Sequence, residues 1–570
     1  MYRKILCDWF LDDSAHAPIR LDAPDFVEEA LKCVGFIGDG TMFEERLASE
    51  WIYRRRWSYV ARFGLLPDGR RVFINVSRLR GKWSIYINNV LCAEGTDGSA
   101  EFEATGRFTG EDEMRICFEA PEGNELRPVF GFAGAAMVRY TGPCAVTELD
   151  SGVDETGKTY LYARVDTTGN QKIELKLRAE SPAGVREVSY RGEVNRLANL
   201  HIGIDPLPCG QSCELHAQLY TGGTLGDELV TYTVPADTSI ARRGFIGDGG
   251  DVCAACKNAG GNTVFTRDAK ADSFCRLLAA RHALTALPVG CRDAETAPKA
   301  LSKAERLLEI AGSEKELEKP VLWALTQSDK GAYDGVKALM PGAELEEIAS
   351  FSRVRQALDV RKLAFEKRLE NRDLVLDNVS ADYEKPASAS LFDAPGQPRP
   401  AYFALAGAWK KRACFAVVPE TVPEDGIFTC RVHCLSDDRK SVPCTVKAEL
   451  FGEDGALLYT TAYSCYTNSG LAGSFTAELT GERGFIRCTL TAEGEECVSD
   501  TAVSKKPLLP GELLPTQLLA DNGKITNVGR TVAFYVCIPA GEFFGCLLPG
   551  QSVTADRGNP DTAEGLNSFI

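Results

Sequence analysis

The sequence predicts a multidomain, mainly β protein in which β sandwiches flank a short α/β segment. Three observations support this prediction. With 570 residues, the chain is too long to fold around one hydrophobic core. From Trp51 to about Val234, and again beyond Trp409, short segments alternate apolar and polar residues between turn-forming residues, as antiparallel strands do. Between these stretches, helical spacing alternates with short apolar runs, which indicates βα units around a parallel sheet.

The first β stretch divides into two sets of strands. WSIYINNVL and MRICFEA belong to the first set, and KTYLYARVD, QKIELKLRAE and CELHAQLY belong to the second. A break near residues 143–152 separates them. Strands of this kind form antiparallel jelly rolls or sandwiches. We therefore predict a jelly roll over residues 1–148 and an immunoglobulin-like sandwich over residues 149–238.

The middle segment, residues 239–409, has the pattern of an α/β fold. Residues 344–370 show the clearest helical spacing, because their apolar residues fall on one face. These residues are Leu345, Ile348, Phe351, Val354, Leu358 and Leu363. The other expected helices span residues 250–258, 269–283 and 298–318, and the expected strands span residues 262–266, 284–290 and 321–325.

The alternating pattern returns beyond Trp409. FTCRVHCL, TVKAELFG, GALLYTTAY, GSFTAEL and FIRCTLTA predict one immunoglobulin-like sandwich over residues 410–505. ITNVGRTVAFYVCIP and LLPGQSVTA add the strands of a partial sandwich over residues 506–570. The expected order is therefore two β domains, one α/β domain and two further β domains.

The charge and hydropathy of the chain disfavour several partners. A net charge of −16 argues against nucleic acid and anionic membranes, since their phosphate groups attract cationic surfaces. The first apolar run is interrupted by Asp8 and closed by Asp12 and Asp13, so no signal peptide is expected. The late run TVAFYVCIPAGEFFGCLLPG contains Pro539 and Gly541 and is not expected to span a bilayer. We expect a cytoplasmic protein.

The twenty cysteines are expected to be reduced and buried. Most are single residues within apolar, strand-like runs, where a thiol acts as a small hydrophobic side chain. Cys253 and Cys256 have the spacing of a redox or zinc motif, but a zinc site needs further ligands in register. Cys209 and Cys213 would have to join them in space, and a buried helical pair is the simpler interpretation. We therefore expect neither a metal site nor a cofactor.

Four stretches of the chain carry a resemblance to a known family. FIGDGTMFEERLASEWIYRRRW (residues 36–57) has a Gly-Asp loop and an acidic pair before a W-x-Y-R strand. SIYINNVLCAEG (residues 84–95) has the form of a hairpin. AGGNTVFT and DSFCRLLAARHALTALP, within residues 259–288, look like the first βα units of a barrel, and LFDAPGQPRPAYFALAGAW (residues 391–409) looks like its exit. In this order they resemble the β-mannosidase branch of glycoside hydrolase family 2.

The resemblance implies a sugar-binding-like jelly roll at the N-terminus and a TIM-like (β/α) barrel in the middle of the chain. Such enzymes use two glutamates at strand ends, an acid/base and a nucleophile, and retention requires carboxyl groups about 5–5.5 Å apart. This chain departs from the family in length. About 160 residues lie between Ala241 and Pro400, whereas a complete (β/α)8 barrel takes about 250. The barrel is therefore expected to be truncated.

The catalytic positions also depart from the family pattern. LWALTQS resembles the acid/base motif, but it places Gln327 and Ser328 where Asn and Glu are expected. A serine hydroxyl is too weak an acid to protonate a leaving oxygen. Asp329 lies one position further along, and on a strand that shift turns the side chain to the other face. No segment resembles the nucleophile motif, so the acids available to an active enzyme are Asp329, Asp334, Glu344, Glu346 and Glu347.

The last three of these acids also have a structural interpretation. Glu344, Glu346 and Glu347 follow Pro341-Gly342 at the start of an expected helix. Acidic side chains in the first turn of a helix complement its dipole, and this interpretation is the stronger one.

Few residues remain to bind a sugar. Residues 131–142 and 206–210, where the family carries tryptophans of the substrate loop and the second domain, contain no tryptophan. Indole rings stack on sugars, so their absence weakens the case for the ancestral mannoside. Trp323 and Gln327 are the remaining candidates for contact with a carbohydrate.

The sequence therefore predicts a non-catalytic relative, a pseudo-glycosidase that binds carbohydrate or serves as a scaffold. A truncated barrel exposes apolar strand edges that must be covered, so we expect a homo-oligomer or a complex with another protein. Two alternatives stay open. One is an active retaining β-glycosidase with rearranged carboxylates, and the other is a structural interaction protein without affinity for sugars.

Overall fold

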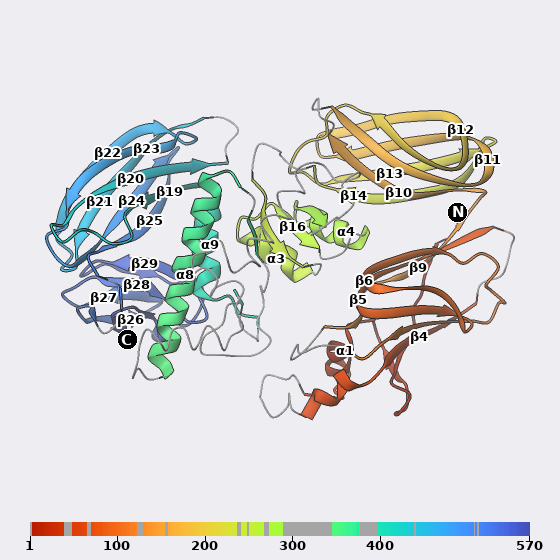
Figure 1. The fold of residues 1–570 in the computed structure, drawn as a ribbon, viewed down its shortest axis with the longest axis horizontal. Coiled ribbons are helices and arrows are strands. Elements are labelled where there is room, and N and C mark those ends of the chain that lie inside the picture. Colours follow the sequence, from red (N-terminus) through yellow and green to blue (C-terminus); the bar gives the residue numbers. More distant parts are fainter. Residues whose placement is uncertain are drawn as a thin grey trace. The chain divides into compact units, whose positions relative to one another are not determined.

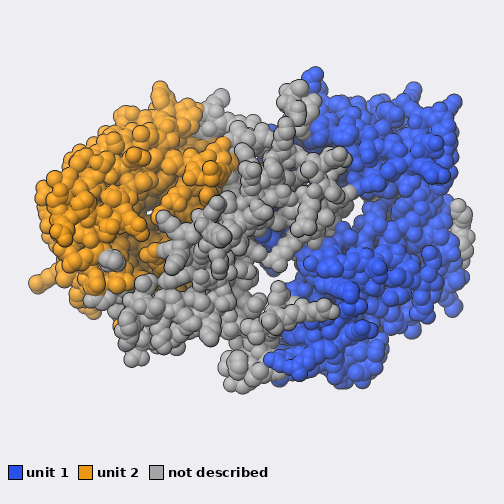
Figure 2. Space-filling model, in the orientation of Figure 1, with its two compact units in different colours: residues 1–238, 245–257, 262–301 blue, residues 239–244, 258–261, 302–570 orange. Residues whose placement is uncertain are grey.

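The computed structural model is rich in β strands, and most of its helices come from the middle of the chain (Figure 1). It describes residues 3–38, 48–64, 70–121, 129–153, 158–235, 241–247, 250–266, 273–288, 345–372, 374–376, 391–392, 396–437, 441–506, 508–509 and 512–569. The chain forms two compact units (Figure 2). Unit 1 comprises residues 1–238, 245–257 and 262–301, and unit 2 comprises residues 239–244, 258–261 and 302–570.

The N-terminal β domain of unit 1 is a nine-stranded sheet in the order β1-β9-β5-β7-β4-β2-β3, with β6 and β8 paired to β5. Its alternating sequence directs every second side chain into one core, as in β7, where Met114, Ile116 and Phe118 are buried. Helix α1 (Val27–Cys33) contributes its apolar residues to the same core. The strands are β1 (Arg3–Ile5), β2 (Trp9–Asp12), β3 (Ile19–Leu21), β4 (Trp57–Phe63), β5 (Arg71–Ile87), β6 (Val90–Glu103), β7 (Asp112–Phe118), β8 (Gly131–Phe132) and β9 (Ala136–Thr141).

The hairpin predicted over residues 84–95 is confirmed. Ile87 of β5 pairs with Val90 of β6, which leaves Asn88 and Asn89 as a two-residue turn. Both asparagines have positive φ, which a type I′ turn requires at its two central positions. Asparagine tolerates this conformation, so the turn forms without a glycine.

The strand predicted for Trp51–Arg54 is wrong, because Glu50–Arg54 form a short 3₁₀ helix, η1. The turn buries Ile52 completely. The carbonyl oxygen of Ile52 accepts hydrogen bonds from the Arg55 N–H and from the Trp57 indole. These contacts stabilise a helical turn that apolar periodicity over four residues cannot reveal.

The second β domain of unit 1 is a five-stranded antiparallel sheet in the order β10-β11-β13-β14, with β12 paired to β11. The boundary predicted between residues 148 and 149 falls inside β10, whose Cys144 already pairs with Thr167 of β11. The strands are β10 (Cys144–Val153), β11 (Thr159–Ser181), β12 (Gly184–Gly203), β13 (Cys213–Thr221) and β14 (Thr224–Thr233).

A buried ion pair links these two sheets within unit 1. Arg139 of β9 donates to Asp227 of β14 over 2.5 Å and to Glu101 of β6 over 3.0 Å. The side chain of Asp227 is 0% exposed and also accepts a hydrogen bond from the Val146 N–H. A buried carboxylate is tolerated here because both a cation and a backbone donor face it.

The middle segment begins with the predicted βα units. Strand β16 (Thr263–Thr266) pairs in parallel with β17 (Thr285–Pro288), and α4 (Ser273–Arg281) connects them. Strand β15 (Arg243–Ile246) and helix α3 (Gly250–Asn258) precede them. The helices and strands predicted over residues 250–258, 269–283, 262–266 and 284–290 are confirmed in their described parts, and those predicted over 298–318 and 321–325 lie outside the described residues.

The helix predicted over residues 344–370 is confirmed as α8 (Leu345–Leu369) in unit 2. Three residues of its predicted apolar face, Phe351, Val354 and Leu363, are buried. Phe351 and Val354 belong to the apolar core of the C-terminal sheet. The helix therefore contributes to two domains of unit 2, since it also packs along α9.

The predicted exit from the barrel forms helix α9 (Pro400–Trp409), which lies beside α8 (Figure 1). Pro400 occupies its first helical position, where the missing N–H costs no hydrogen bond. Strand β18 (Leu374–Leu376) precedes α9 in the chain, and its Leu374 N–H donates to the carbonyl of Arg242. The described residues contribute four strands to this sheet, in the order β17-β16-β15-β18, and the complete TIM-like barrel stays a prediction.

The first C-terminal β domain has two sheets, β19-β20-β23 and β22-β21-β24-β25. Their facing side chains form one core that is rich in cysteine. The five predicted strands of this domain are confirmed, and β19 and β25 are additional. The strands are β19 (Arg412–Val417), β20 (Ile427–Ser436), β21 (Pro443–Gly452), β22 (Leu457–Tyr466), β23 (Gly470–Glu478), β24 (Arg483–Ala492) and β25 (Glu495–Ser504).

The last domain is a seven-stranded sheet in the order β29-β28-β31-β32-β26-β27-β30. Its core includes Phe534, Tyr535 and Cys546, which pack with residues of α8. The strands are β26 (Thr516–Asp521), β27 (Lys524–Asn527), β28 (Ala533–Cys537), β29 (Phe543–Leu547), β30 (Ser552–Thr554), β31 (Glu564–Gly565) and β32 (Ser568–Phe569).

None of the helices that the structure describes combines the length and the apolar character needed to cross a bilayer. The described cysteines are free thiols, and most of them are buried, as the sequence predicts. Cys253 and Cys256 are a buried pair on α3, and the Sγ of Cys256 donates to the carbonyl of Thr263. The pair therefore packs as part of the helix, in agreement with the simpler interpretation.

Candidate functional site

The carboxyl ends of the parallel strands are the first place to look for chemistry, because active sites of (β/α) barrels lie there. Among the described residues, β16 ends at Thr266, β17 at Pro288 and β18 at Leu376, and Gly247 follows β15. None of these four carries an acid. The next acidic residues of the sequence, Asp248, Asp268 and Asp377, lie outside the described residues.

Sequence reasoning did not consider these three aspartates. Each follows a short strand within two residues, which becomes clear only when the ends of the strands are known. The strands β15 and β18 were not predicted, since segments of three or four residues are too short to show a periodic pattern. Asp248, Asp268 and Asp377 therefore join the acids that a test of catalysis must include.

The structure describes little of the predicted catalytic set. Trp323, Gln327, Ser328, Asp329, Asp334 and Glu344 lie outside the described residues. The backbone of Glu346 belongs to α8, and the side chain of Glu347 is exposed in the first turn of that helix. This is the place that the helix-dipole interpretation requires, at the start of a helix and away from a strand end.

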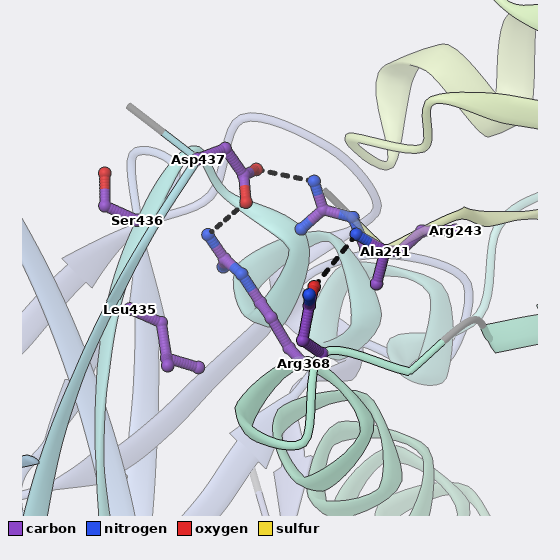
Figure 3. A pocket seen from close by; sticks show the side chains of 7 residues that line it. Ala241, Arg243, Arg368, Leu435, Ser436 and Asp437 are labelled. Atoms are coloured by element: carbon purple, nitrogen blue, oxygen red, sulfur yellow. Dashed lines mark hydrogen bonds and ion pairs between the residues drawn. The ribbon is translucent and has the colours of Figure 1, made fainter. Parts of the chain in front are cut away.

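Unit 2 contains a buried group of charges that sequence reasoning missed. The carboxylate of Asp437 accepts hydrogen bonds from Arg243 and from Arg368, and Figure 3 shows the two guanidinium groups converging on it. The carbonyls of Ala408, Lys410 and Lys411 accept further hydrogen bonds from Arg368, at 2.7–2.9 Å. Arg368 thus fastens the end of α8 to the exit of α9.

This charge group is too small to be a sugar site. Burial lowers the pKa of Arg368 to about 10, and the neighbouring charge of Arg243 acts in the same direction. The cavity beside the two arginines has a volume of about 80 Å³ and is also lined by Ala241 and Asn371. Pockets that hold organic ligands are typically about 300–1,000 Å³. We therefore assign this group to the packing of α8 and not to catalysis.

A larger hollow lies on the N-terminal domain of unit 1. It has a volume of about 440 Å³ and is lined by Ala48, Glu50, Trp51, Arg54 and Arg55, which we call the Trp51 hollow. The guanidinium of Arg55 lies 4.7 Å from the centre of the Trp51 ring. Glu50 and Arg54 form an ion pair at 3.0 Å beside it. An indole with paired charges at its rim is a combination that suits a polyhydroxylated ligand.

The position of Arg55 in this hollow is held by Asp13. The carboxylate of Asp13 accepts hydrogen bonds from Arg55 and from the ring of His16. Burial raises the pKa of Asp13, but the hydrogen bonds from His16, Ala15 and Arg55 outweigh it, so this pKa lies well below its usual range. Asp13 is therefore ionised at neutral pH and keeps Arg55 over the indole.

The sequence matches no protein-family model and no curated protein. Solved structures do match it. The β-D-mannosidase of Dictyoglomus thermophilum is 10% identical, with a TM-score of 0.66 over 100% of both chains. The exo-chitosanase of Amycolatopsis orientalis is 12% identical, with a TM-score of 0.64 over 100% of this chain and 99% of that one.

The chain has a glycoside hydrolase family 2 fold. The likeness covers the whole chain, so it includes the β domains and the βα segment alike. It confirms the family 2-like fold that the four sequence stretches resemble, and the TIM-like barrel stays a prediction. At 10–12% identity it is a likeness of fold, and the chemistry of this chain has to be argued from its own residues.

Proposed function

We propose that this chain is a non-catalytic protein with a glycoside hydrolase family 2 fold, a pseudo-glycosidase that binds carbohydrate or acts as a scaffold. The length of its βα segment carries this proposal. Residues 243–409, from the start of β15 to the end of α9, number 167. A complete barrel of eight units takes about 250 residues, or about 31 for each unit. The segment has room for about five units.

A shortened barrel weakens the catalytic geometry that the fold otherwise supplies. A retaining glycosidase needs two carboxyl groups about 5–5.5 Å apart, each on a strand end that the closed barrel holds in place. With fewer strands, the spacing of opposite strand ends changes. Ser328, at the position that resembles the acid/base, is also unable to protonate a leaving oxygen.

The Trp51 hollow supports a role in carbohydrate binding. We expect a β-mannoside or a chito-oligosaccharide to bind the wild type in isothermal titration calorimetry, and Trp51→Ala to abolish binding by removing the indole that lines the hollow. Tyr466→Ala is the matched control, since Tyr466 is an exposed aromatic residue of unit 2. Equal binding by Trp51→Ala and the wild type would remove the hollow from the proposal.

An active retaining β-glycosidase is the second candidate, because two solved structures that resemble this chain bear the names of a β-D-mannosidase and an exo-chitosanase. Its carboxylates would come from Asp329, Asp334, Glu344, Glu346 and Glu347, or from the strand-end residues Asp248, Asp268 and Asp377. The test is a hydrolysis assay of purified protein against a panel of aryl glycosides, with β-mannoside first. We expect no turnover from a protein that melts cooperatively. Turnover that one Asp→Asn or Glu→Gln variant abolishes would overturn the proposal and name a catalytic residue.

The scaffold role is tested by the state of assembly. We expect light scattering of the purified chain to give a homo-oligomer, or co-purification to give a complex with another protein, since a shortened barrel leaves apolar edges to cover. A monomer that neither aggregates nor binds sugars would contradict the scaffold role and the binding role together. A stable oligomer without affinity for sugars would favour a structural interaction protein.

A further inference from the structure

Three thiols converge within the first C-terminal β domain. The Sγ atoms of Cys434 and Cys444 are 3.9 Å apart, and those of Cys444 and Cys465 are 3.5 Å apart. All three Sγ atoms lie within 4.8 Å of one another. Among the residues that the structure describes, this is the group of cysteines, histidines and acids compact enough to hold a metal ion.

The three cysteines come from three strands and from both sheets of the sandwich. Cys444 of β21 stands directly opposite Cys465 of β22 in the antiparallel register. Cys434 belongs to β20, in the other sheet, and faces them across the core. Cys434 and Cys444 are buried, whereas Cys465 is partly exposed. The thiols therefore form a triangle with one corner near solvent.

The size of this triangle matches a metal site better than a disulfide. A disulfide joins two sulfurs at about 2.05 Å. Thiolates that bind Zn²⁺ at about 2.3 Å in a tetrahedral arrangement lie about 3.8 Å from one another. The Cys444–Cys465 and Cys434–Cys444 separations, 3.5 and 3.9 Å, bracket that value.

We propose that Cys434, Cys444 and Cys465 bind a thiophilic divalent cation of the zinc class, with a fourth position open on the Cys465 side. Binding converts three thiols into thiolates and releases three protons to solvent, including the one that Cys434 donates to the carbonyl of Thr467. A divalent ion leaves one net negative charge on the site, whereas a monovalent ion leaves two in a largely buried place. The divalent ion is favoured because burying charge is costly.

The other cysteines of this core provide the contrast. Cys430 and Cys488 are fully buried in the same core and belong to no such group of three. They show what a thiol does as a small hydrophobic residue alone. The proposal is independent of whether the chain hydrolyses glycosides, because the site lies in the C-terminal sandwich and not in the βα segment.

The test is metal binding by the reduced, full-length protein. We expect one equivalent of Zn²⁺ in competition with a chromophoric chelator, and a thiolate charge-transfer absorption when Cd²⁺ is added. Cys465→Ser is expected to weaken Zn²⁺ by about 100-fold or more, since even changes outside the ligand shell cost about 10–100-fold. Cys430→Ala is the control and should bind like the wild type. Cys444→Ala removes the central thiol and should abolish the Cd²⁺ absorption.

Three results would overturn the proposal. One is a wild type that binds no Zn²⁺ under reducing conditions. Another is Zn²⁺ affinity that Cys465→Ser leaves unchanged, which would place the metal elsewhere. The third is a Cd²⁺ charge-transfer absorption that Cys444→Ala leaves unchanged in a folded protein. If Cys444→Ala does not fold, Cys465→Ser decides the matter, because Cys465 is partly exposed and its replacement by serine preserves the shape of the side chain.

Discussion

The β domains and the βα segment of this chain differ in the length of their strands. Strands β20, β21, β22, β24 and β25 each have ten residues and pair antiparallel along most of their length. Strands β15, β16 and β17 have four residues each, and β18 has three. Long strands spread the packing energy over many buried side chains, whereas short strands mainly position their ends. The packing of the long strands thus stabilises the fold largely without help from the residues at the ends of the short strands.

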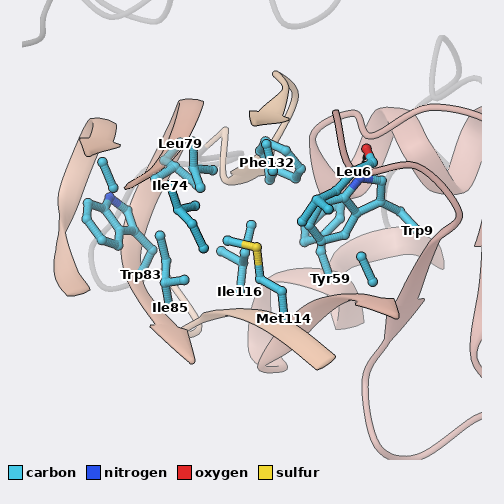
Figure 4. Close-up of a cluster of buried hydrophobic side chains, with 14 of the residues drawn as sticks. Leu6, Trp9, Tyr59, Ile74, Leu79, Trp83, Ile85, Met114, Ile116 and Phe132 are labelled. Atoms are coloured by element: carbon cyan, nitrogen blue, oxygen red, sulfur yellow. Dashed lines mark hydrogen bonds between the residues drawn. The ribbon is translucent and has the colours of Figure 1, made fainter. Parts of the chain in front are cut away.

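This comparison predicts the largest effects in the β domains. Trp9 of β2 is 2% exposed and packs against Phe132 in the N-terminal core (Figure 4). The centroids of the two rings are 5.0 Å apart in an edge-to-face arrangement. Trp9→Ala leaves a large cavity and should destabilise unit 1 by about 4 kcal/mol, measured by calorimetry. Ile5→Ala is the control, since Ile5 is largely exposed. Similar melting of both variants would mean that this core does not determine the stability of unit 1.

The buried ion pair between the two sheets of unit 1 should come next. Asp227→Ala removes the partner that faces Arg139 and the Val146 N–H, and Glu101 remains as the second acceptor for Arg139. We expect a loss of about 3 kcal/mol in denaturant unfolding, because the buried Arg139 loses one of its two carboxylate partners and the buried Val146 N–H loses its acceptor. Asp8→Asn breaks an exposed pair with Arg20 and should cost less than about 1 kcal/mol. If Asp227→Ala costs as little stability as Asp8→Asn, the buried ion pair is not needed for the stability of unit 1.

The attachment of α8 to the last sheet gives an intermediate effect. Arg353 donates to both carboxylate oxygens of Glu564, at 2.7 and 2.8 Å. Arg353→Ala should lower the stability of unit 2 by about 2 kcal/mol, since a two-bond pair of this kind is stronger than a surface pair. Lys362→Ala, which breaks an exposed pair with Glu366 on the same helix, should cost about 0.5 kcal/mol or less. Equal losses in thermal melts would contradict the difference between the two faces of α8.

The smallest effect is expected in the first turn of α8. Glu347→Gln removes a charge near the positive end of the helix dipole and should cost about 0.3–1 kcal/mol at low salt, and less at high salt. It should leave any hydrolysis or sugar binding unchanged. Thermal melts at two salt concentrations check the first part, and the aryl glycoside panel checks the second. Loss of activity without loss of stability would show that Glu347 is a catalytic residue.

Local patterns in the sequence were sufficient for most of the fold. The apolar face of α8 was predicted from the spacing of Phe351, Val354 and Leu363, and the hairpin at Asn88-Asn89 was predicted from its resemblance to a hairpin of the family. Both are determined by residues close in sequence. The short turn at Glu50–Arg54 was missed because its hydrogen bonds from Arg55 and Trp57 depend on where Ile52 packs.

The candidate sites depended on contacts between distant residues. In the sequence, each of the three thiols belongs to a cysteine in a strand-like run. Cys444 meets Cys465 through the register of β21 with β22, and Cys434 joins them because the two sheets pack face to face. Arg243 and Asp437 are separated by 194 positions, so no motif connects them. The predictions about the catalytic positions rest on the resemblance to the family's motifs. They stay predictions for Ser328, at the position that resembles the acid/base, and for Glu344, because both lie outside the described residues.

The most direct test of the central claim is a search for the covalent intermediate of a retaining glycosidase. The purified chain is incubated with 2-deoxy-2-fluoro-β-mannosyl fluoride and, separately, with 5-fluoro-β-glucosaminyl fluoride, which trap a glycosyl ester on the nucleophile, and the intact mass is measured. We predict no increase in mass. We also predict that the Asp→Asn and Glu→Gln variants of the candidate carboxylates bind the unmodified sugars as the wild type does. An increase of one glycosyl group, located by peptide mapping on an aspartate or glutamate of the βα segment, would contradict the proposal and show a working nucleophile.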